Sequence, residues 1–202
     1  MLSLEQETGA LQFEIGDWQL ADWRVAVEAD GARWGLDQAS TEVLCESPLC
    51  VRHVFAEIGL AWTLRAEVEG GTVVVASTLY NRSSEPIRLG KIWLLDSPVP
   101  TGFAEPGDDL VCLDLTGSIF PRLVRAIGVA GTPQTSKIKF QFHNRTRGRA
   151  LHVGFLTFRR ADTEVEYDQD PTQGMTRLRA SCNFAGWELA SGADTETERF
   201  IL

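Results

Sequence analysis

The chain has 202 residues, of which 44% are hydrophobic and 23% charged, and its formal net charge is −9. This composition suffices for one domain with a sizeable core and excludes a disordered chain. A nucleic-acid surface requires a basic stripe, and the one basic cluster here, Arg145, Arg147 and Arg149, is too short. No apolar run approaches the ~20 residues of a membrane helix. Because residues 1–7 also lack the basic and apolar regions of a secretory signal, we predict a single cytoplasmic domain over residues 1–202.

The dominant pattern is strict alternation of apolar and polar residues. From Trp62, every second residue is apolar up to Val68, which is typical of a half-buried strand. Gly70-Gly71 follows, and then a second apolar run begins. Glycine supplies the positive φ of a tight turn, so these segments predict a hairpin. Residues 23–28 repeat the alternation and end at a second turn, Asp30-Gly31.

Three further segments predict strands. One alternates again, with Ile138, Phe140 and Phe142 directed inward. Residues 151–158 and 87–95 are apolar on both faces, as central strands are. The short connections favour antiparallel pairing. The predicted fold class is therefore all-β, a sandwich of two packed antiparallel sheets.

Two segments interrupt this pattern. Residues 121–127 predict the one short helix, of about a single turn. The segment from Asp96 to Asp109 is rich in proline and glycine and predicts a long loop. Such a loop is either functional or a passive crossover between sheets.

Four carboxylates share one face of a predicted strand: Glu164, Glu166, Asp168 and Asp170. Calcium takes several oxygen ligands, so a calcium site is one interpretation. The preferred interpretation is cross-strand ion pairing, because Arg177 and Arg179 lie on one face of the next strand. Opposite charges across a hairpin contribute roughly 0.2–1 kcal/mol per pair and help to set its register.

The three histidines, His53, His143 and His152, have no metal-binding spacing. His152 lies in a strand that reads as buried, which predicts a hydrogen-bonded core histidine. No nucleophile elbow, phosphate-binding loop, zinc-protease or dinucleotide motif occurs. The sequence therefore predicts no catalytic residue, no cofactor-binding residue and no metal ligand.

The cysteines fall into two pairs. Cys112 and Cys182 lie within apolar strand patterns, which predicts small core residues. Cys45 and Cys50 have four residues between them, but no second Cys/His pair completes a zinc knuckle. Two states of this pair remain open, a turn disulfide and the reduced thiols typical of a cytosol.

Tryptophan outnumbers tyrosine six to two. Trp34 follows the Asp30-Gly31 turn, and Trp187 follows Gly186 near the end of the chain. An indole exposed at a loop can stack on the apolar face of a sugar, so these two are the candidate sugar-stacking residues. The alternative is burial of both rings under a loop.

The order of three segments resembles a known family. Residues 81–87 read N-R-S-S-E-P-I, residues 152–158 read H-V-G-F-L-T-F, and residues 191–202 read S-G-A-D-T-E-T-E-R-F-I-L. Over roughly residues 70–202 this order is similar to the N-terminal β-supersandwich domain, galactose-mutarotase-like in fold, of α-galactosidase-like glycoside hydrolases. There a G-F-L-T strand precedes a P-G-E-x-x-x-S-E strand that leads into a catalytic (β/α)8 barrel. Ser191-Gly192-Ala193 departs from the Pro-Gly-Glu of that pattern.

The resemblance implies a non-catalytic domain that supports a (β/α)8 catalytic domain absent from this chain. The family's catalytic carboxylates lie on that barrel, so none is transferred to this sequence. The implied partners are a carbohydrate and the barrel domain, and a second copy of the chain is a further expected partner. Two alternatives are a free-standing carbohydrate-binding or scaffold protein and a sugar epimerase, which would need a general acid and base facing one pocket.

Overall fold

The computed structural model describes the chain except for residues 16, 116–122, 128–133, 171 and 173. The described part consists of β-strands and one 3-10 turn, η1 (Leu36–Gln38), without an α-helix. The strands are β1 (Leu2–Leu4), β2 (Leu11–Ile15), β3 (Trp18–Ala29), β4 (Ala32–Gly35), β5 (Ser40–Glu46), β6 (Leu49–Phe55), β7 (Leu60–Glu69), β8 (Thr72–Asn81), β9 (Ile87–Pro98), β10 (Leu110–Leu115), β11 (Leu123–Ala126), β12 (Gln134–Ser136), β13 (Lys139–Asn144), β14 (Arg149–Phe155), β15 (Asp162–Asp170), β16 (Gly174–Leu189), β17 (Asp194–Glu196) and β18 (Phe200–Ile201).

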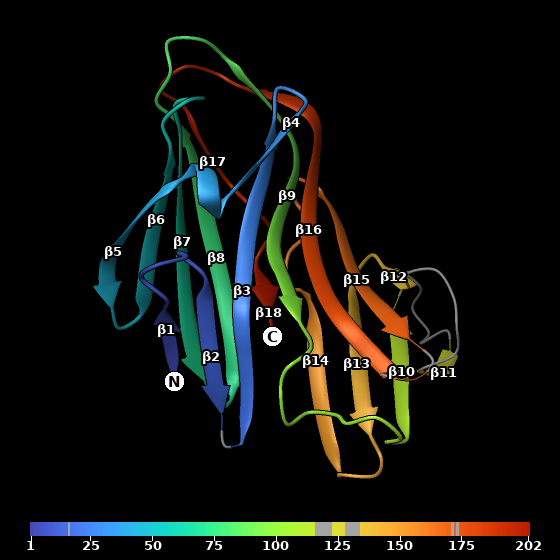
Figure 1. Ribbon diagram of the computed structural model, residues 1–202. Coiled ribbons are helices and arrows are strands. Elements are labelled where there is room, and N and C mark those ends of the chain that lie inside the picture. The colour runs from blue at the N-terminus through green and yellow to red at the C-terminus, as the bar shows by residue number, and fades with distance from the viewer. Residues whose placement is uncertain (16, 116–122, 128–133, 171, 173) are drawn as a thin grey trace.

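The strands form two antiparallel sheets that pack face to face (Figure 1). The first has eight strands in the order β1-β2-β3-β9-β16-β15-β12, with β4 paired to β3. The second has ten strands in the order β11-β10-β13-β14-β18-β8-β7-β6-β5, with β17 paired to β8. This arrangement confirms the predicted two-sheet all-β sandwich.

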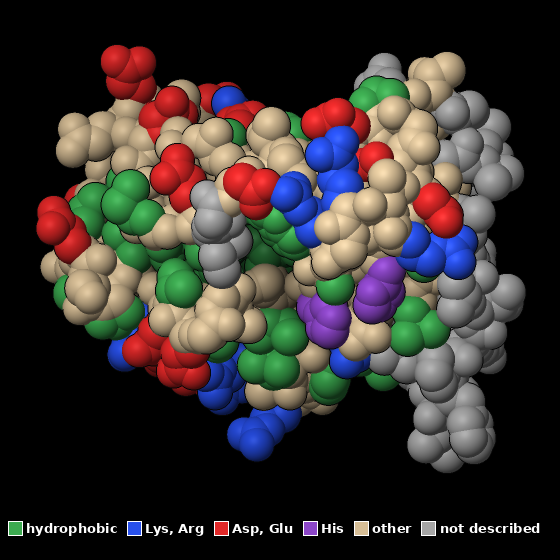
Figure 2. Space-filling model, turned by 90° about the horizontal axis from the view of Figure 1, so that it is seen from below, with side chains coloured by type: hydrophobic (Ala, Val, Ile, Leu, Met, Phe, Trp, Pro, Cys, Tyr) green, Lys and Arg blue, Asp and Glu red, His purple; other side chains and the backbone are tan. Residues whose placement is uncertain are grey.

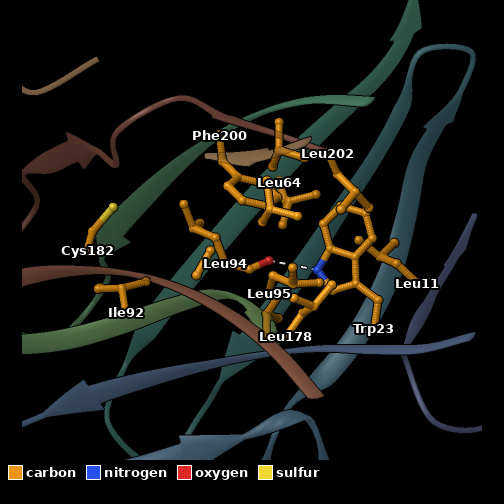
Figure 3. Close-up of a cluster of buried hydrophobic side chains, with 14 of the residues drawn as sticks. Leu11, Trp23, Leu64, Ile92, Leu94, Leu95, Leu178, Cys182, Phe200 and Leu202 are labelled. Carbon is orange, nitrogen blue, oxygen red and sulfur yellow. Dashed lines mark hydrogen bonds between the residues drawn. The ribbon is translucent and has the colours of Figure 1, made fainter. Parts of the chain in front are cut away.

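Inward-facing side chains of both sheets form one core. Trp23 and Trp62 are fully buried, and the indole Nε1 of Trp23 donates to the carbonyl oxygen of Leu94 at 2.7 Å. Figure 3 shows this bond among leucines of both sheets. The Tyr167 ring lies edge-on to Phe140 and Phe142, with centroid distances of 5.0 and 5.2 Å. Such aromatic pairs contribute about 0.5–1.5 kcal/mol beyond the burial of their area.

Both predicted glycine turns are confirmed. Gly70 and Gly71 join β7 to β8 with φ of 56° and 85°. Asp30 and Gly31 join β3 to β4 with φ of 51° and 80°. Positive φ at both central residues gives a turn whose twist matches that of the flanking strands.

The predictions for the apolar segments are partly wrong. Strand β9 lies at the centre of its sheet as expected, but it continues to Pro98, so the loop begins after Pro98 and not at Asp96 as predicted. Strand β14 ends at Phe155, and Leu156 and Phe158 are half exposed. The amide of Leu156 still donates to the Arg199 carbonyl at 2.8 Å, next to the last pair of the β14–β18 ladder.

The predicted helix at residues 121–127 is also wrong where the structure describes it. Leu123–Ala126 form strand β11, which pairs with β10. Residues 121 and 122 lie outside the described part of the chain. Pairing with an available sheet edge overrides the weak local preference of four residues.

Candidate functional site

Cross-strand ion pairs occupy the outer face of the eight-stranded sheet, as predicted. The guanidinium of Arg179 contacts Glu166 and, at 2.5 Å, Asp168. Glu164 accepts from Lys91 Nζ at 2.8 Å. Burial raises the pKa of Glu164, but Lys91 and Lys137, which lies 3.6 Å away, lower it by more. Basic side chains thus pair with three of the four carboxylates, whereas Asp170 accepts hydrogen bonds from the amide and hydroxyl of Thr172.

The partner of Arg177 differs from the predicted one. Its Nε donates at 2.6 Å to Asp96 on β9, whose other carboxylate oxygen accepts from Arg33 Nη2 at 3.2 Å. The Asp96 side chain is 7% exposed, so two arginines compensate a buried charge. The Arg33 guanidinium also lies 4.3 Å from the centre of the Trp93 ring.

The buried histidine is His53, and the prediction for His152 is wrong. His152 is exposed because it points away from the core on β14, between the inward-facing Leu151 and Val153. It lies diagonally across the ladder from His143, since His152 pairs with Gln141 and His143 with Ala150. Partial burial, Lys139 and His143 all lower the pKa of His152. Histidine side chains lie together on one surface in Figure 2.

Trp187 lies at an irregular turn of strand β16. The register shifts between Asn183 and Trp187, and Ala185 and Gly186 take positive φ of 54° and 79°. This bulge leaves the indole 48% exposed. A groove of about 400 Å³ adjoins it, lined by Arg160, Phe184, Trp187, Asp194 and Thr195.

The groove at Trp187 combines a flat apolar ring with polar groups. The ring of Phe184 lies beneath, 6.2 Å from that of Trp187 and tilted by 35°. Arg160, Asp194 and Thr195 complete the lining of the groove, and the Arg160 guanidinium pairs with Glu196 at 3.2 Å. Such an arrangement can stack on a sugar ring and hydrogen-bond its hydroxyl groups.

Trp34, the second candidate, lies apart from Trp187. It is partly buried on β4 and packs against the core. Its Nε1 is buried without a hydrogen-bond partner among the described residues. Strands β3 and β9 lie between β4 and β16, so the fold does not bring the two indoles together.

A second hollow opens at the opposite end of the sandwich, beside the start of β8. This cleft has a volume of about 290 Å³, and Figure 2 views this end and shows hydrophobic side chains within the hollow. Its walls are largely apolar, with Thr72 and His152 among the polar groups. The residues that line it include Phe13, Trp18, Leu20, Pro100, Leu151 and Leu202.

Arg149 lies beside this cleft and links two of the segments that surround it. Arg149 lies 5.9 Å from the Trp18 ring and contacts the carbonyl oxygen of Gly102 and the carboxylate of Asp17. Sequence reasoning missed the cleft because its residues come from five separate segments of the chain. The available signal was Trp18, one of six tryptophans.

Glu198 closes the loop that follows β14. The side chain is 2% exposed, and its Oε1 accepts backbone N–H groups from Arg159 at 2.7 Å, Ala161 at 3.1 Å and also Arg160. Burial raises the pKa of Glu198, but hydrogen bonds from the Thr157 hydroxyl and this backbone lower it by more. The carboxylate therefore serves as the anchor of a loop.

Cys112 and Cys182 are fully buried, which confirms their predicted place in the core. Within the described ranges, no three His, Cys, Asp or Glu side chains are grouped to hold a metal ion. The described segments also contain no helix with the length and apolarity that a membrane crossing requires.

Comparison with solved structures identifies proteins with a similar fold. The chain is similar to the GH36 α-galactosidase AgaB from Geobacillus stearothermophilus, with 14% identity and a TM-score of 0.55 over 99% of this chain and 29% of that one. The galactosidase domain of the α-galactosidase–sucrose kinase AgaSK gives 13% identity and a TM-score of 0.56, with the same two coverages. The α-galactosidase from Lactobacillus brevis gives 15% identity, a TM-score of 0.53 and coverages of 99% and 28%.

These comparisons confirm the resemblance to α-galactosidase-like glycoside hydrolases at the level of the fold. The chain spans less than a third of the length of those structures. No protein-family model and no curated protein matches the sequence.

Proposed function

We propose that this chain is a non-catalytic β-sandwich domain of an α-galactosidase-like glycoside hydrolase, in which it supports a (β/α)8 catalytic domain. The carrying observation is the structural match, which includes 99% of this chain but only 29% of AgaB. A match of nearly the whole chain to one part of a longer enzyme favours a domain with a covalent partner. The proposal includes a cytoplasmic location and association with a second copy of the chain.

The arrangement of buried carboxylates is compatible with this proposal. Asp96 is held by two arginines and Glu198 by backbone amides, so both serve the fold. Glycoside hydrolysis instead needs two carboxyl groups that face each other across a sugar-sized space. We therefore assign the chemistry to the proposed partner domain.

The test is to read the gene beyond Leu202 and to assay both the complete product and residues 1–202 on an aryl α-galactoside. We expect the reading frame to continue into an alternating β/α pattern. The complete product should hydrolyse the substrate, and the isolated domain should not. A stop codon directly after Leu202, or full activity in the isolated domain, would overturn the proposal.

A second candidate function is carbohydrate binding, which the exposed Trp187 favours. Calorimetric titration with galactosides should give heat that Trp187→Ala abolishes. Trp34→Ala tests the other predicted stacking residue, and Trp18→Ala tests the cleft at the opposite end. Absence of heat across a panel of sugars would count against binding by any of the three tryptophans.

A further inference from the structure

We propose that Cys45 and Cys50 form a redox-reactive dithiol that exchanges with small peptide disulfides and closes to an intramolecular disulfide. The two residues are direct partners in the antiparallel ladder of β5 and β6, one pair away from the Ser47-Pro48 turn. Directly opposed residues in such a ladder have Cα atoms about 4.5–5.5 Å apart, within the ~4.4–6.8 Å that a disulfide spans. Both thiols are free.

The two thiols differ in their access to a ligand. Cys50 is half-buried and lines a groove of about 330 Å³ on the outer face of the ten-stranded sheet. Cys45 is exposed on the edge strand β5, outside the residues that line the groove, and its Sγ lies 3.6 Å from the Ser47 carbonyl oxygen. A disulfide that enters the groove therefore meets Cys50 first, and Cys45 is the adjacent thiol that can resolve the product.

The groove beside Cys50 has the chemistry of a site for an anionic peptide. Arg65, the ladder partner of Cys50 on β7, lines it together with Arg199. Glu196 is also in the lining and Glu67 contacts Arg65 at 3.4 Å, so the site is mixed in charge. Two guanidinium groups beside threonine hydroxyls suit the carboxylates and amides of a short peptide such as glutathione.

The incoming disulfide is the oxidant in this reaction. The Cys50 thiolate attacks one sulfur of glutathione disulfide, forms a mixed disulfide and releases one glutathione thiolate. The Cys45 thiolate then attacks the Cys50 sulfur and displaces the second glutathione. The protein loses two electrons and two protons overall, and one glutathione disulfide is reduced to two thiols.

The experiment treats the full chain with glutathione disulfide and follows free thiols and intact mass. We expect wild type to lose two thiols and two hydrogen atoms in mass, without a dimer, and dithiothreitol should restore both thiols. Cys45→Ser should instead stop at one bound glutathione on Cys50. The buried Cys112 and Cys182 serve as internal controls and should stay reduced.

The role of the groove is tested with Arg65→Gln and Arg199→Gln. Each should slow the reaction with glutathione disulfide about 2- to 5-fold, which is the range of an exposed ion pair. Neither should change the rate with uncharged hydroxyethyl disulfide. The proposal is overturned if wild type keeps bound glutathione, forms an intermolecular dimer, or fails to react. Equal slowing with both reagents would overturn the assignment of the groove.

Discussion

Glu198 and His53 are both buried polar side chains, but their environments differ in how fully they satisfy the buried group. Glu198, between β17 and β18, accepts three backbone N–H groups through one oxygen. His53, on β6, has one hydrogen bond among the described residues, 2.9 Å between its Nδ1 and the Thr41 hydroxyl. Its Nε2 is buried without a partner among the residues described, and the Trp62 ring lies 6.4 Å away.

The difference decides how each group titrates. At Glu198, hydrogen bonds to the charged form outweigh burial, so its pKa is lowered. At His53, burial acts alone and lowers the pKa to about 4. Glu198 is therefore stable as an ion, and His53 is stable as a neutral ring. Comparable burial gives opposite charge states because only one site supplies partners for the charge.

The largest expected effect comes from Glu198→Ala. The substitution leaves three partly buried N–H groups of the 159–161 loop without their acceptor, which should reduce the free energy of unfolding by about 4 kcal/mol. Urea denaturation measures it. The matched control is Glu196→Ala, since Glu196 is 67% exposed and pairs with Arg160 at 3.2 Å. That control should lose less than about 1 kcal/mol, and equal losses would show that Glu198 is not a special anchor.

His53 should produce the next largest effect, as a dependence of stability on pH. Its pKa falls from 6.5 to about 4 on folding, so below pH 6.5 the unfolded chain binds a proton that the native chain does not. Stability should therefore fall as pH is lowered from 6.5 to about 4, by about 3 kcal/mol in total. Urea unfolding across this range measures the slope.

The control for this slope is His53→Leu, which removes the titrating ring and the unsatisfied nitrogen. The variant should lose most of the slope that lies above pH 4.5, and the lowered pKa of His152 should supply the remainder. Glu198 contributes in a different window, because a lowered carboxyl pKa gives stability that is lost only as pH falls below about 4.5. An unchanged slope between pH 6.5 and 5 in His53→Leu would assign the effect to other groups.

Sequence reasoning could predict the strands but not these two sites. Period-two alternation predicts which residues face inward, and it contains a signal for His53, which shares its parity with the fully buried Val51 and Phe55. The apolar run at 151–158 concealed this signal by suggesting that His152 was the core histidine. Glu198 gave no signal, since its partners lie 37–39 residues away and are backbone amides, which no residue type reveals.

Asp96 extends the comparison to a buried carboxylate that is held by charges in place of backbone amides. Asp96→Asn keeps the size of the side chain but removes the charge that faces Arg33 and Arg177. Because both arginines are about half exposed, water screens them and the loss should be about 1–2 kcal/mol, smaller than at Glu198. Asp22→Asn is the control, since the Asp22–Arg24 pair at 2.6 Å is exposed on both sides and should contribute less than about 0.5 kcal/mol. A loss at Asp96 as large as that at Glu198 would mean that partly solvated arginines hold a buried carboxylate as firmly as backbone amides do.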